Sequence, residues 1–331
     1  MISIGILGCG RIGQVHAGSL ARMPQARLTA VADAIPEAAE TLATVSGAVA
    51  RSAEDIISSP DIDAVIVATP TALHYDQIHA LAQAGKAIFC EKPIDLSADR
   101  AAECKAAVEA AGVLFMTAFN RRFDPSFAHL QAQLAGGVIG LAELVVITSR
   151  DPAPPPVSYI KQSGGLFRDM MIHDFDMARF LLGEDPVEIY AVGACLVDPE
   201  IGNAGDIDTA MVTLKTASGK LAQINNSRRA TYGYDQRIEV HGASGMLQAG
   251  NQLEHHVVHA RQTGFASAPN KHFFLERYAA AYLAELQCFV DALNGAEVII
   301  PGISDGVAAQ RLADAAAQSY AAGVPVHLKL S

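Results

Sequence analysis

Short apolar runs alternate with longer amphipathic segments along the first part of this 331-residue chain. Continuous apolar runs are typical of strands that are buried on both faces of a parallel sheet. The segments between them carry apolar residues at helical spacing, so strand and helix alternate. The runs cover residues 2–7, 26–32, 63–68, 86–90 and 113–119. The pattern therefore predicts a doubly wound parallel sheet.

A different pattern follows residue 119. Residues 187–247 alternate apolar and polar positions over several short runs, which predicts a large, mostly antiparallel sheet with one covered face. The remaining predicted elements are a helix over 166–182, helices over 274–293 and 302–322, and a last strand over 325–330. We therefore expect an α/β protein with two domains, residues 1–119 and residues 120–331. Because an open sheet face often becomes a subunit interface, we also expect a homo-oligomer.

A glycine-rich turn lies between the first predicted strand and the first predicted helix, with the sequence Gly8-Cys9-Gly10-Arg11-Ile12-Gly13. In a G-x-G-x-x-G turn, the first glycine allows the tight turn and the second lets the backbone approach a pyrophosphate. The third glycine lets helix and strand pack closely, and the helix N-terminus supplies N–H groups and a positive dipole end. The turn therefore predicts a dinucleotide-binding site.

Asp33 lies at the end of the second predicted strand, twenty residues after Gly13. A carboxylate at this position accepts hydrogen bonds from the hydroxyls of an adenosine ribose and repels a 2′-phosphate. Ala34 follows where an NADP enzyme often has a basic residue. The sequence therefore favours NAD over NADP, with an ordinary β-α-β turn and a surface aspartate as the alternative.

Ligands of doubly wound sheets bind beyond the carboxyl ends of the strands, which directs attention to the residues that follow each strand. Among these, Lys92 stands in Glu91-Lys92-Pro93, directly after an apolar strand. A lysine held there can donate a hydrogen bond to a substrate hydroxyl and stabilise a developing alkoxide. The alternative is a solvated loop lysine. Thr69-Pro70 and Asn120-Arg121 follow other strands of the sheet.

Asp169 and His173 are four residues apart in the helix predicted over 166–182, so we expect them on one face. A histidine beside a carboxylate is the usual arrangement of a general base, since its pKa lies near working pH. The alternative is a structural His–Asp pair. A metal site would need further ligands, and His255, His256 and His259 lie in a polar stretch, so we expect no metal.

Composition narrows the class of protein. The net charge is −11 and no stretch is rich in lysine and arginine, which argues against nucleic-acid binding. The five cysteines are odd in number and form no C-x-x-C pair, as expected for reduced thiols in a cytoplasmic protein. No apolar run is long enough to span a bilayer, and we expect no signal peptide because the chain starts with a strand.

These motifs together resemble the Gfo/Idh/MocA oxidoreductase family over essentially the whole chain. The glycine turn, Glu91-Lys92-Pro93 and Asp169-x-x-x-His173 are similar to the three signatures of that family. Further segments look like the inositol 2-dehydrogenase branch, namely residues 119–124, 149–152, 164–165 and Tyr232-Gly233-Tyr234-Asp235. The resemblance implies an N-terminal Rossmann domain, a C-terminal α/β domain with an open sheet, and a homotetramer.

The resemblance also implies roles for individual residues. Lys92, Asp169 and His173 would be catalytic. The inositol site would be lined by Asn120, Arg121, Asp151 and one or both of Tyr232 and Tyr234. Besides the glycine turn and Asp33, the cofactor would lie along Thr69, Pro70, His74, Glu91 and Lys92.

The implied reaction is the oxidation of a ring hydroxyl of myo-inositol to the ketone, with transfer of a hydride to NAD. His173 would be the general base, assisted by Asp169 and Lys92. Two alternatives stay open. One is an NAD-dependent dehydrogenase of another inositol isomer or of a sugar such as glucose, and the other is a non-catalytic NAD-binding regulator.

Overall fold

The computed structural model describes residues 1–328, and these form two compact units. The first unit comprises residues 1–123 and 281–311, and the second comprises residues 124–280 and the chain from residue 312. The expected division into residues 1–119 and 120–331 differs from these units, because residues 281–311 pack with the N-terminal part of the chain. Each unit is described separately below.

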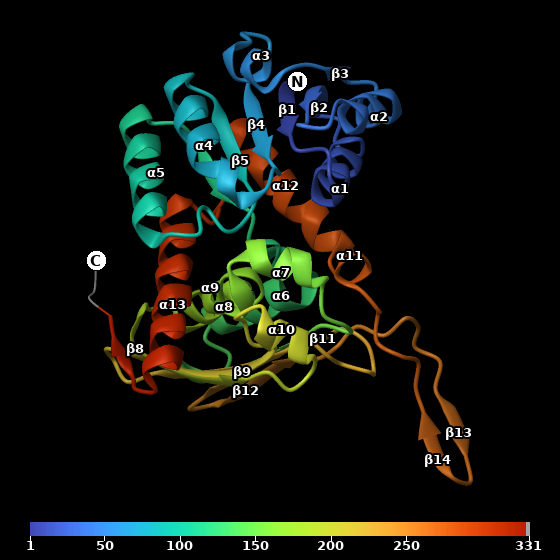
Figure 1. The fold of residues 1–331 in the computed structure, drawn as a ribbon. Coiled ribbons are helices and arrows are strands. Elements are labelled where there is room, and N and C mark those ends of the chain that lie inside the picture. The colour runs from blue at the N-terminus through green and yellow to red at the C-terminus, as the bar shows by residue number, and fades with distance from the viewer. Residues whose placement is uncertain (329–331) are drawn as a thin grey trace. The chain divides into compact units, whose positions relative to one another are not determined.

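The first unit contains a parallel sheet with the strand order β3-β2-β1-β4-β5-β6, which confirms the doubly wound arrangement (Figure 1). The order reverses between β1 and β4, where ligands of such sheets bind. The strands are β1 (Ile2–Leu7), β2 (Ala26–Ala32), β3 (Val49–Ala50), β4 (Ala64–Val67), β5 (Ala87–Cys90) and β6 (Phe115–Thr117). The helices are α1 (Arg11–Leu20), α2 (Pro36–Ser46), α3 (Ala53–Ser58), α4 (His74–Gln83) and α5 (Ala98–Ala111), with 3₁₀ turns η1 (Thr71–Leu73) and η2 (Asn120–Phe123).

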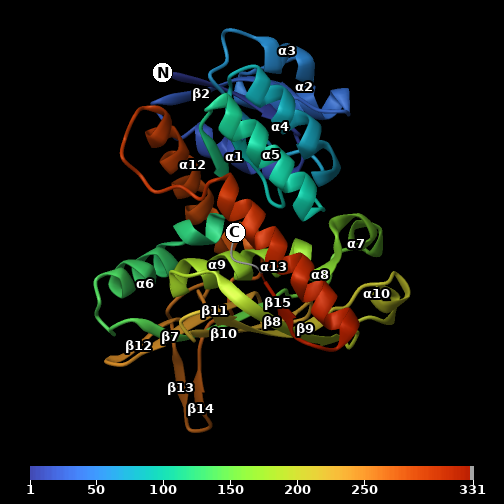
Figure 2. The same cartoon turned by 90° about the vertical axis from the view of Figure 1, so that its left-hand side faces the viewer.

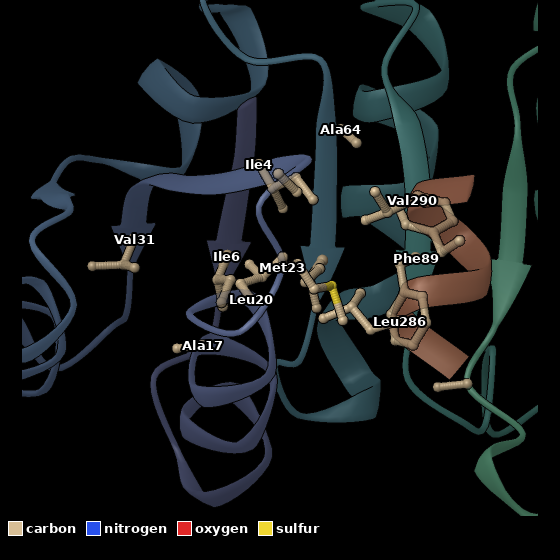
Figure 3. Close-up of a cluster of buried hydrophobic side chains, with 14 of the residues drawn as sticks. Ile4, Ile6, Ala17, Leu20, Met23, Val31, Ala64, Phe89, Leu286 and Val290 are labelled. Carbon is tan, nitrogen blue, oxygen red and sulfur yellow. The ribbon is translucent and has the colours of Figure 1, made fainter. Parts of the chain in front are cut away.

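Two helices from late in the chain complete the hydrophobic cores on the two faces of this sheet. One core joins α1 and α2 to α12 (Ala279–Leu293), and the other joins α3, α4 and α5 to the start of α13 (Ile303–Ala322). Leu286 and Val290 of α12 lie beside Phe89 of β5 (Figure 3). The rings of Phe89 and Phe289 meet edge to face, with their centroids 5.5 Å apart.

A cluster of ionisable side chains lies within the first of these cores. The Nε2 atom of His16 on α1 is 2.8 Å from Oε1 of Glu91, the residue after β5. Glu285 on α12 is fully buried, and neither of its carboxyl oxygens has a hydrogen-bond partner among residues 1–328. Burial raises the pKa of Glu285 well above its usual value, and the negative charge of Glu91 raises it further. We therefore infer that Glu285 is protonated at neutral pH.

The second unit contains a seven-stranded sheet with the order β12-β11-β7-β10-β9-β8-β15. Within residues 1–328, β7 and β10 are the one parallel pair of this sheet, so the sheet is mostly antiparallel, as expected. The strands are β7 (Ala142–Arg150), β8 (Pro186–Ala194), β9 (Thr209–Thr216), β10 (Leu221–Ser227), β11 (Asp235–Gly242), β12 (Gly245–Ala249) and β15 (Val326–His327). The last strand was expected over 325–330, of which residues 329 and 330 lie outside the described part of the chain.

Helices cover one face of this second sheet (Figures 1 and 2). Among them, α9 packs on β7 and β10, and α6 packs on β12. The short hairpin of β13 (His259–Arg261) and β14 (Gly264–Ala266) projects from the sheet (Figure 1). The remaining helices of the unit are α6 (Pro125–Ala135), α7 (Val157–Ser163), α8 (Gly165–Asp169), α9 (Ile172–Leu182), α10 (Pro199–Asn203) and α11 (Phe274–Arg277). No helix among residues 1–328 is both long and apolar enough to cross a bilayer.

The single helix expected over 166–182 is divided into α8 and α9. The division occurs at Met170 and Met171, whose amides both donate to the carbonyl of Leu166. Because the second of these bonds spans five residues instead of four, the helical turn is wider at this point. Asp169 therefore ends one helix and His173 lies in the first turn of the next, so the expectation of one shared helical face is wrong.

The contribution of α12 to the core can be tested by shortening one of its side chains. We expect Val290→Ala to lower the free energy of unfolding by about 2 kcal/mol, because it removes buried methyl groups and leaves a cavity. Urea denaturation measures this change. Val45→Ala is the matched control, since Val45 on α2 is 82 % exposed and should cost little. Equal losses in the two variants would contradict the packing of α12 in this core.

The protonation of Glu285 predicts a pH-dependent stability. As pH rises above about 4.5, the usual value for a glutamate, the unfolded chain releases this proton while the folded protein keeps it. The wild type therefore loses stability that Glu285→Gln does not lose. We expect the free energy of unfolding of Glu285→Gln, relative to wild type, to increase by up to about 1.4 kcal/mol per pH unit.

The measurement is urea denaturation of both proteins between pH 5 and pH 8. Glu40→Gln on the exposed face of α2 is the control, and its difference from wild type should stay nearly constant. A difference between Glu285→Gln and wild type that does not vary with pH would show that Glu285 is ionised in the folded protein.

Candidate functional site

Close backbone contacts explain the glycines of the turn between β1 and α1. Gly8 has φ +98°, and a Cβ atom on it would lie 2.4 Å from the carbonyl oxygen of Ala68. A Cβ atom on Gly13 would lie 2.0 Å from the carbonyl oxygen of Gly8. At Gly10, by contrast, a Cβ atom would meet nothing within 4 Å. The backbone is therefore tightly packed around Gly8 and Gly13 and open at Gly10, as a turn that binds a pyrophosphate requires.

Asp33 holds this turn in place. Its Oδ2 atom accepts a hydrogen bond of 2.7 Å from the amide of Cys9, and its Oδ1 atom accepts one of 2.9 Å from the amide of Ile35. Gly10, the residue before α1, supplies no side-chain cap, so the first amides of this helix are available to an anion. The residues present thus fit a dinucleotide, and the carboxylate of Asp33 fixes the conformation of the turn.

His74 links two loops at the carboxyl edge of the same sheet. Its Nε2 atom lies 2.9 Å from the carbonyl oxygen of Thr69, and its Nδ1 atom lies 2.9 Å from that of Pro93. Burial lowers the pKa of His74. Because both of its ring nitrogens face backbone carbonyls, His74 has a structural role in joining these loops. Its predicted place along the cofactor, together with Thr69 and Pro70, stays a prediction.

Glu91 and Lys92 follow β5 at this edge of the sheet and are partly buried. The Lys92–Pro93 peptide bond is cis. The side chain of Glu91 turns to His16 on α1, so the helix of the glycine turn and the loop of Lys92 are joined by a hydrogen bond. Asn120 and Arg121 lie in η2 after β6 and are both buried.

The carboxylate of Asp169 in the second unit has partners from two other segments. The hydroxyl of Tyr159 on α7 donates to its Oδ1 atom at 2.8 Å. The guanidinium of Arg228, which follows β10, is 3.4 Å from its Oδ2 atom and 3.8 Å from Oδ2 of Asp206. His173 lies partly buried in the first turn of α9. The carboxylate of Asp169 therefore has hydrogen-bond donors from α7 and from the segment after β10.

The two predicted tyrosines differ in their surroundings. Tyr232 is half exposed, and its hydroxyl donates to Asp235 at 2.7 Å and accepts from Arg150 at 2.8 Å. Tyr234 is buried, with its ring edge-on to Tyr278 at 6.0 Å. Asp151 follows β7 and is partly buried. The structure thus places these residues near the ends of β7 and β11, and their contact with a substrate stays a prediction.

The sequence analysis missed Tyr159, Asp206 and Arg228 as partners of Asp169. Arg228 is 59 residues from Asp169 in the sequence, and no motif connects them. Asp206 also lines a pocket of about 550 Å³ beside α8, whose lining residues include Lys161 and Tyr320 but neither Asp169 nor His173. Among residues 1–328, no group of three His, Cys, Asp or Glu side chains is arranged to hold a metal ion.

Comparisons with known proteins agree with this geometry. The family model for the NAD-binding Rossmann fold of the Gfo/Idh/MocA oxidoreductases matches residues 2–119, and the model for their C-terminal alpha/beta domain matches residues 131–328. An inositol 2-dehydrogenase of Rhizobium meliloti (strain 1021) is 52 % identical over 320 residues, covering 97 % of each chain.

Two solved structures are also similar to this chain in their three-dimensional fold. The myo-inositol dehydrogenase of Corynebacterium glutamicum has a TM-score of 0.95 at 42 % identity and covers 100 % of both chains. The scyllo-inositol dehydrogenase of Lactobacillus casei, solved with NAD(H) and scyllo-inositol, has a TM-score of 0.91 at 31 % identity and covers 99 % of both chains. With its glycine turn, its parallel sheet and these matches over nearly its whole length, the chain belongs to the Gfo/Idh/MocA family of NAD-binding oxidoreductases.

Proposed function

We propose that this protein is an NAD-dependent inositol 2-dehydrogenase that oxidises a ring hydroxyl of myo-inositol to the ketone. The observation that carries the proposal is the presence of Lys92, Asp169 and His173, at the positions of the three ionisable groups in the family signatures, in a chain 52 % identical to a protein named inositol 2-dehydrogenase. A regulator that only binds NAD would not need these three groups together.

The glycine turn and Asp33 hold the dinucleotide in this proposal. The open space at Gly10 and the N-terminus of α1 receive the pyrophosphate, and Asp33 accepts from the ribose hydroxyls. Bound NAD supplies the acceptor for the hydrogen that leaves the ring carbon with its electron pair. Asp33 excludes a 2′-phosphate by charge, so the cofactor is NAD in preference to NADP.

The side chains move the proton and stabilise charge on the reacting oxygen. His173 accepts the proton of the ring hydroxyl as general base. The carboxylate of Asp169 orients the imidazole and stabilises the imidazolium that forms. Lys92 donates a hydrogen bond to the same oxygen and stabilises its developing negative charge. Asn120, Arg121, Asp151 and Tyr232 or Tyr234 hold the other hydroxyls of the ring.

Another inositol isomer is the second candidate substrate. The Lactobacillus casei relative was solved with scyllo-inositol, which differs from myo-inositol only in the orientation of one hydroxyl. A single hydroxyl changes the pattern of hydrogen bonds in a polar pocket without changing the chemistry of the site. A panel of polyols therefore decides between the isomers.

We also propose that the open face of the second sheet associates with other copies of the chain, as in the homotetramer that the family resemblance implies. Leu221 pairs with Leu144 across β10 and β7, and His241 of β11 lies between Leu144 and Met246 of β12. The three apolar side chains in this row are exposed in the single chain. Three exposed apolar side chains in a row that crosses four strands, with a histidine at the position on β11, suit burial against a second sheet.

The proposed activity is tested by the absorbance of reduced cofactor with NAD or NADP and a panel of myo-, scyllo- and chiro-inositol, glucose and xylose. We expect NAD reduction to be strongest with myo-inositol. Because the proton transfer and the stabilisation of the alkoxide depend on them, His173→Ala and Lys92→Ala should each lower kcat by about a hundredfold or more. Binding of NAD, measured by calorimetry, should persist in both variants.

The controls for these variants are His129→Ala and Lys105→Ala, which remove an exposed histidine and a partly exposed lysine outside the proposed site. Wild-type turnover in purified His173→Ala or Lys92→Ala would remove that residue from the mechanism. NAD binding without turnover of any polyol by the wild-type protein would favour the regulator.

The proposed interface predicts that a charge in the apolar row weakens association. Leu144→Lys places an ammonium group on a surface that would be buried between copies, so we expect sedimentation to show smaller assemblies than the wild type forms. Leu196→Lys introduces the same charge at an exposed leucine outside the sheet and serves as the control. Unchanged assembly of Leu144→Lys would place the interface elsewhere.

A further inference from the structure

We infer that Arg228 is a positioning residue, which holds the carboxylate of Asp169 between itself and Tyr159 and, with Asp206, sets the net charge beside the general base. This inference rests on the proposed function, because it assigns His173 as the base and Asp169 as its partner. Arg228 lies outside the family signatures, and it acts on the reaction only through Asp169.

The geometry first shows a buried cation placed between two carboxylates. Arg228 is only 1 % exposed, and its side chain is among the largest of those fully buried in the chain. One terminal nitrogen, Nη2, lies 3.4 Å from Asp169 and 3.8 Å from Asp206. A buried guanidinium keeps its charge and needs anionic partners nearby, and Asp169 and Asp206 are placed to be those partners.

Further contacts hold the members of this cluster in place. The backbone amide of Arg228 donates to the carbonyl of Asp208 at 2.8 Å. Oδ1 of Asp206 accepts a 3.1 Å hydrogen bond from the amide of Leu166, in the first turn of α8. Asp169 ends that same helix, so the two carboxylates that contact Arg228 are both tied to α8. The backbone bond to Asp208 and the bond between Asp206 and α8 therefore both fix the position of Arg228 relative to Asp169.

Tyr159 provides the other contact with Asp169. Desolvation of its hydroxyl and the negative charge of Asp169 raise its pKa, so the hydroxyl keeps its proton and donates it to Oδ1. Arg228 faces Oδ2 of the same carboxylate. Tyr159 and Arg228 thus contact different oxygens of Asp169, and a carboxylate has further lone pairs for an imidazole N–H.

The charges around Asp169 and His173 come from several elements of the second unit. Asp151 after β7 lies close enough to Tyr159 to raise its pKa. Asp174 and Asp176 of α9 are buried, and Asp174 accepts a 2.9 Å hydrogen bond from Asn226. With Asp169, Asp206 and Arg228, these groups make the surroundings negative. Arg228 is the cation that the structure places in contact with Asp169.

This charge balance has a direct consequence for the base. Nearby negative charge favours the imidazolium form of a histidine, and nearby positive charge opposes it. Asp169, Arg228 and Asp206 together carry one net negative charge. Loss of Arg228 leaves two negative charges, whereas loss of the Asp206 charge leaves none. The two losses therefore change the pKa of the base in opposite directions.

The test is the pH profile of kcat/KM for myo-inositol with saturating NAD, since its acidic limb reports the base in the enzyme–NAD complex before inositol binds. We expect Arg228→Met to move this limb to higher pH by about 0.5 to 1 unit. Asp206→Asn should move it to lower pH by about half a unit. The double variant Arg228→Met/Asp206→Asn restores the net charge, and its limb should return close to that of the wild type.

Two further readouts separate positioning from loss of fold. Arg228→Met should lower kcat by about tenfold while the affinity for NAD, measured by calorimetry, stays at the wild-type value. Circular dichroism and the melting temperature show whether each variant is folded. If Arg228→Met does not fold, Asp206→Asn and the double variant still decide the question. The matched control is Arg229→Met, which removes an exposed arginine from the adjacent position.

Opposite shifts in the two single variants and a restored profile in the double variant would support the inference. Acidic limbs that coincide with the wild type, or that move in the same direction, would overturn it. An equal shift in Arg229→Met would also overturn it, because any surface charge would then have the same effect. If the wild-type protein oxidises no inositol, the proposed function fails and this inference fails with it.

Discussion

The close approach of Gly13 to the carbonyl oxygen of Gly8 is the constraint on which the first unit depends. Any side chain at Gly13 would place its Cβ atom 2.0 Å from that oxygen, so α1 can start directly after β1 only with glycine there. Asp33 then fixes the turn through the amide of Cys9. The end of β1, the start of α1 and the side chain of Asp33 are thus held in fixed positions. Open space remains above Gly10, where a pyrophosphate fits.

A buried hydrogen bond connects this turn to the second motif of the unit. His16 on α1 meets Glu91, the residue before Lys92, so the helix that receives the pyrophosphate and the loop that carries the lysine are held together. The bond lies in a core that α12 completes from late in the chain, next to the protonated Glu285. The packing of this core and the protonation of Glu285 therefore influence the position of Lys92, which we propose to be catalytic.

In the second unit, the contacts of one partly buried carboxylate, that of Asp169, are the main constraint. Asp169 has Tyr159 on one oxygen and Arg228 near the other, and Asp206 balances the charge of the arginine. A general base works best when its pKa lies near working pH, and the net charge of these neighbours is one means to set it. The open face of the same sheet carries the exposed side chains Leu144, Leu221 and Met246, which we propose to be an association surface.

The sequence by itself determined the features that depend on short-range pattern and steric need: the parallel sheet, the glycine turn, Asp33 at the end of β2 and the mostly antiparallel second sheet. Only the tertiary structure decided which distant segments meet. It divided the helix of Asp169 and His173 at Met170, packed residues 281–311 with the first unit, and brought Arg228 and Asp206 to Asp169. Hydrophobic period and turn chemistry are local properties of a chain, whereas the partner of a buried charge is chosen by the packing of the whole fold.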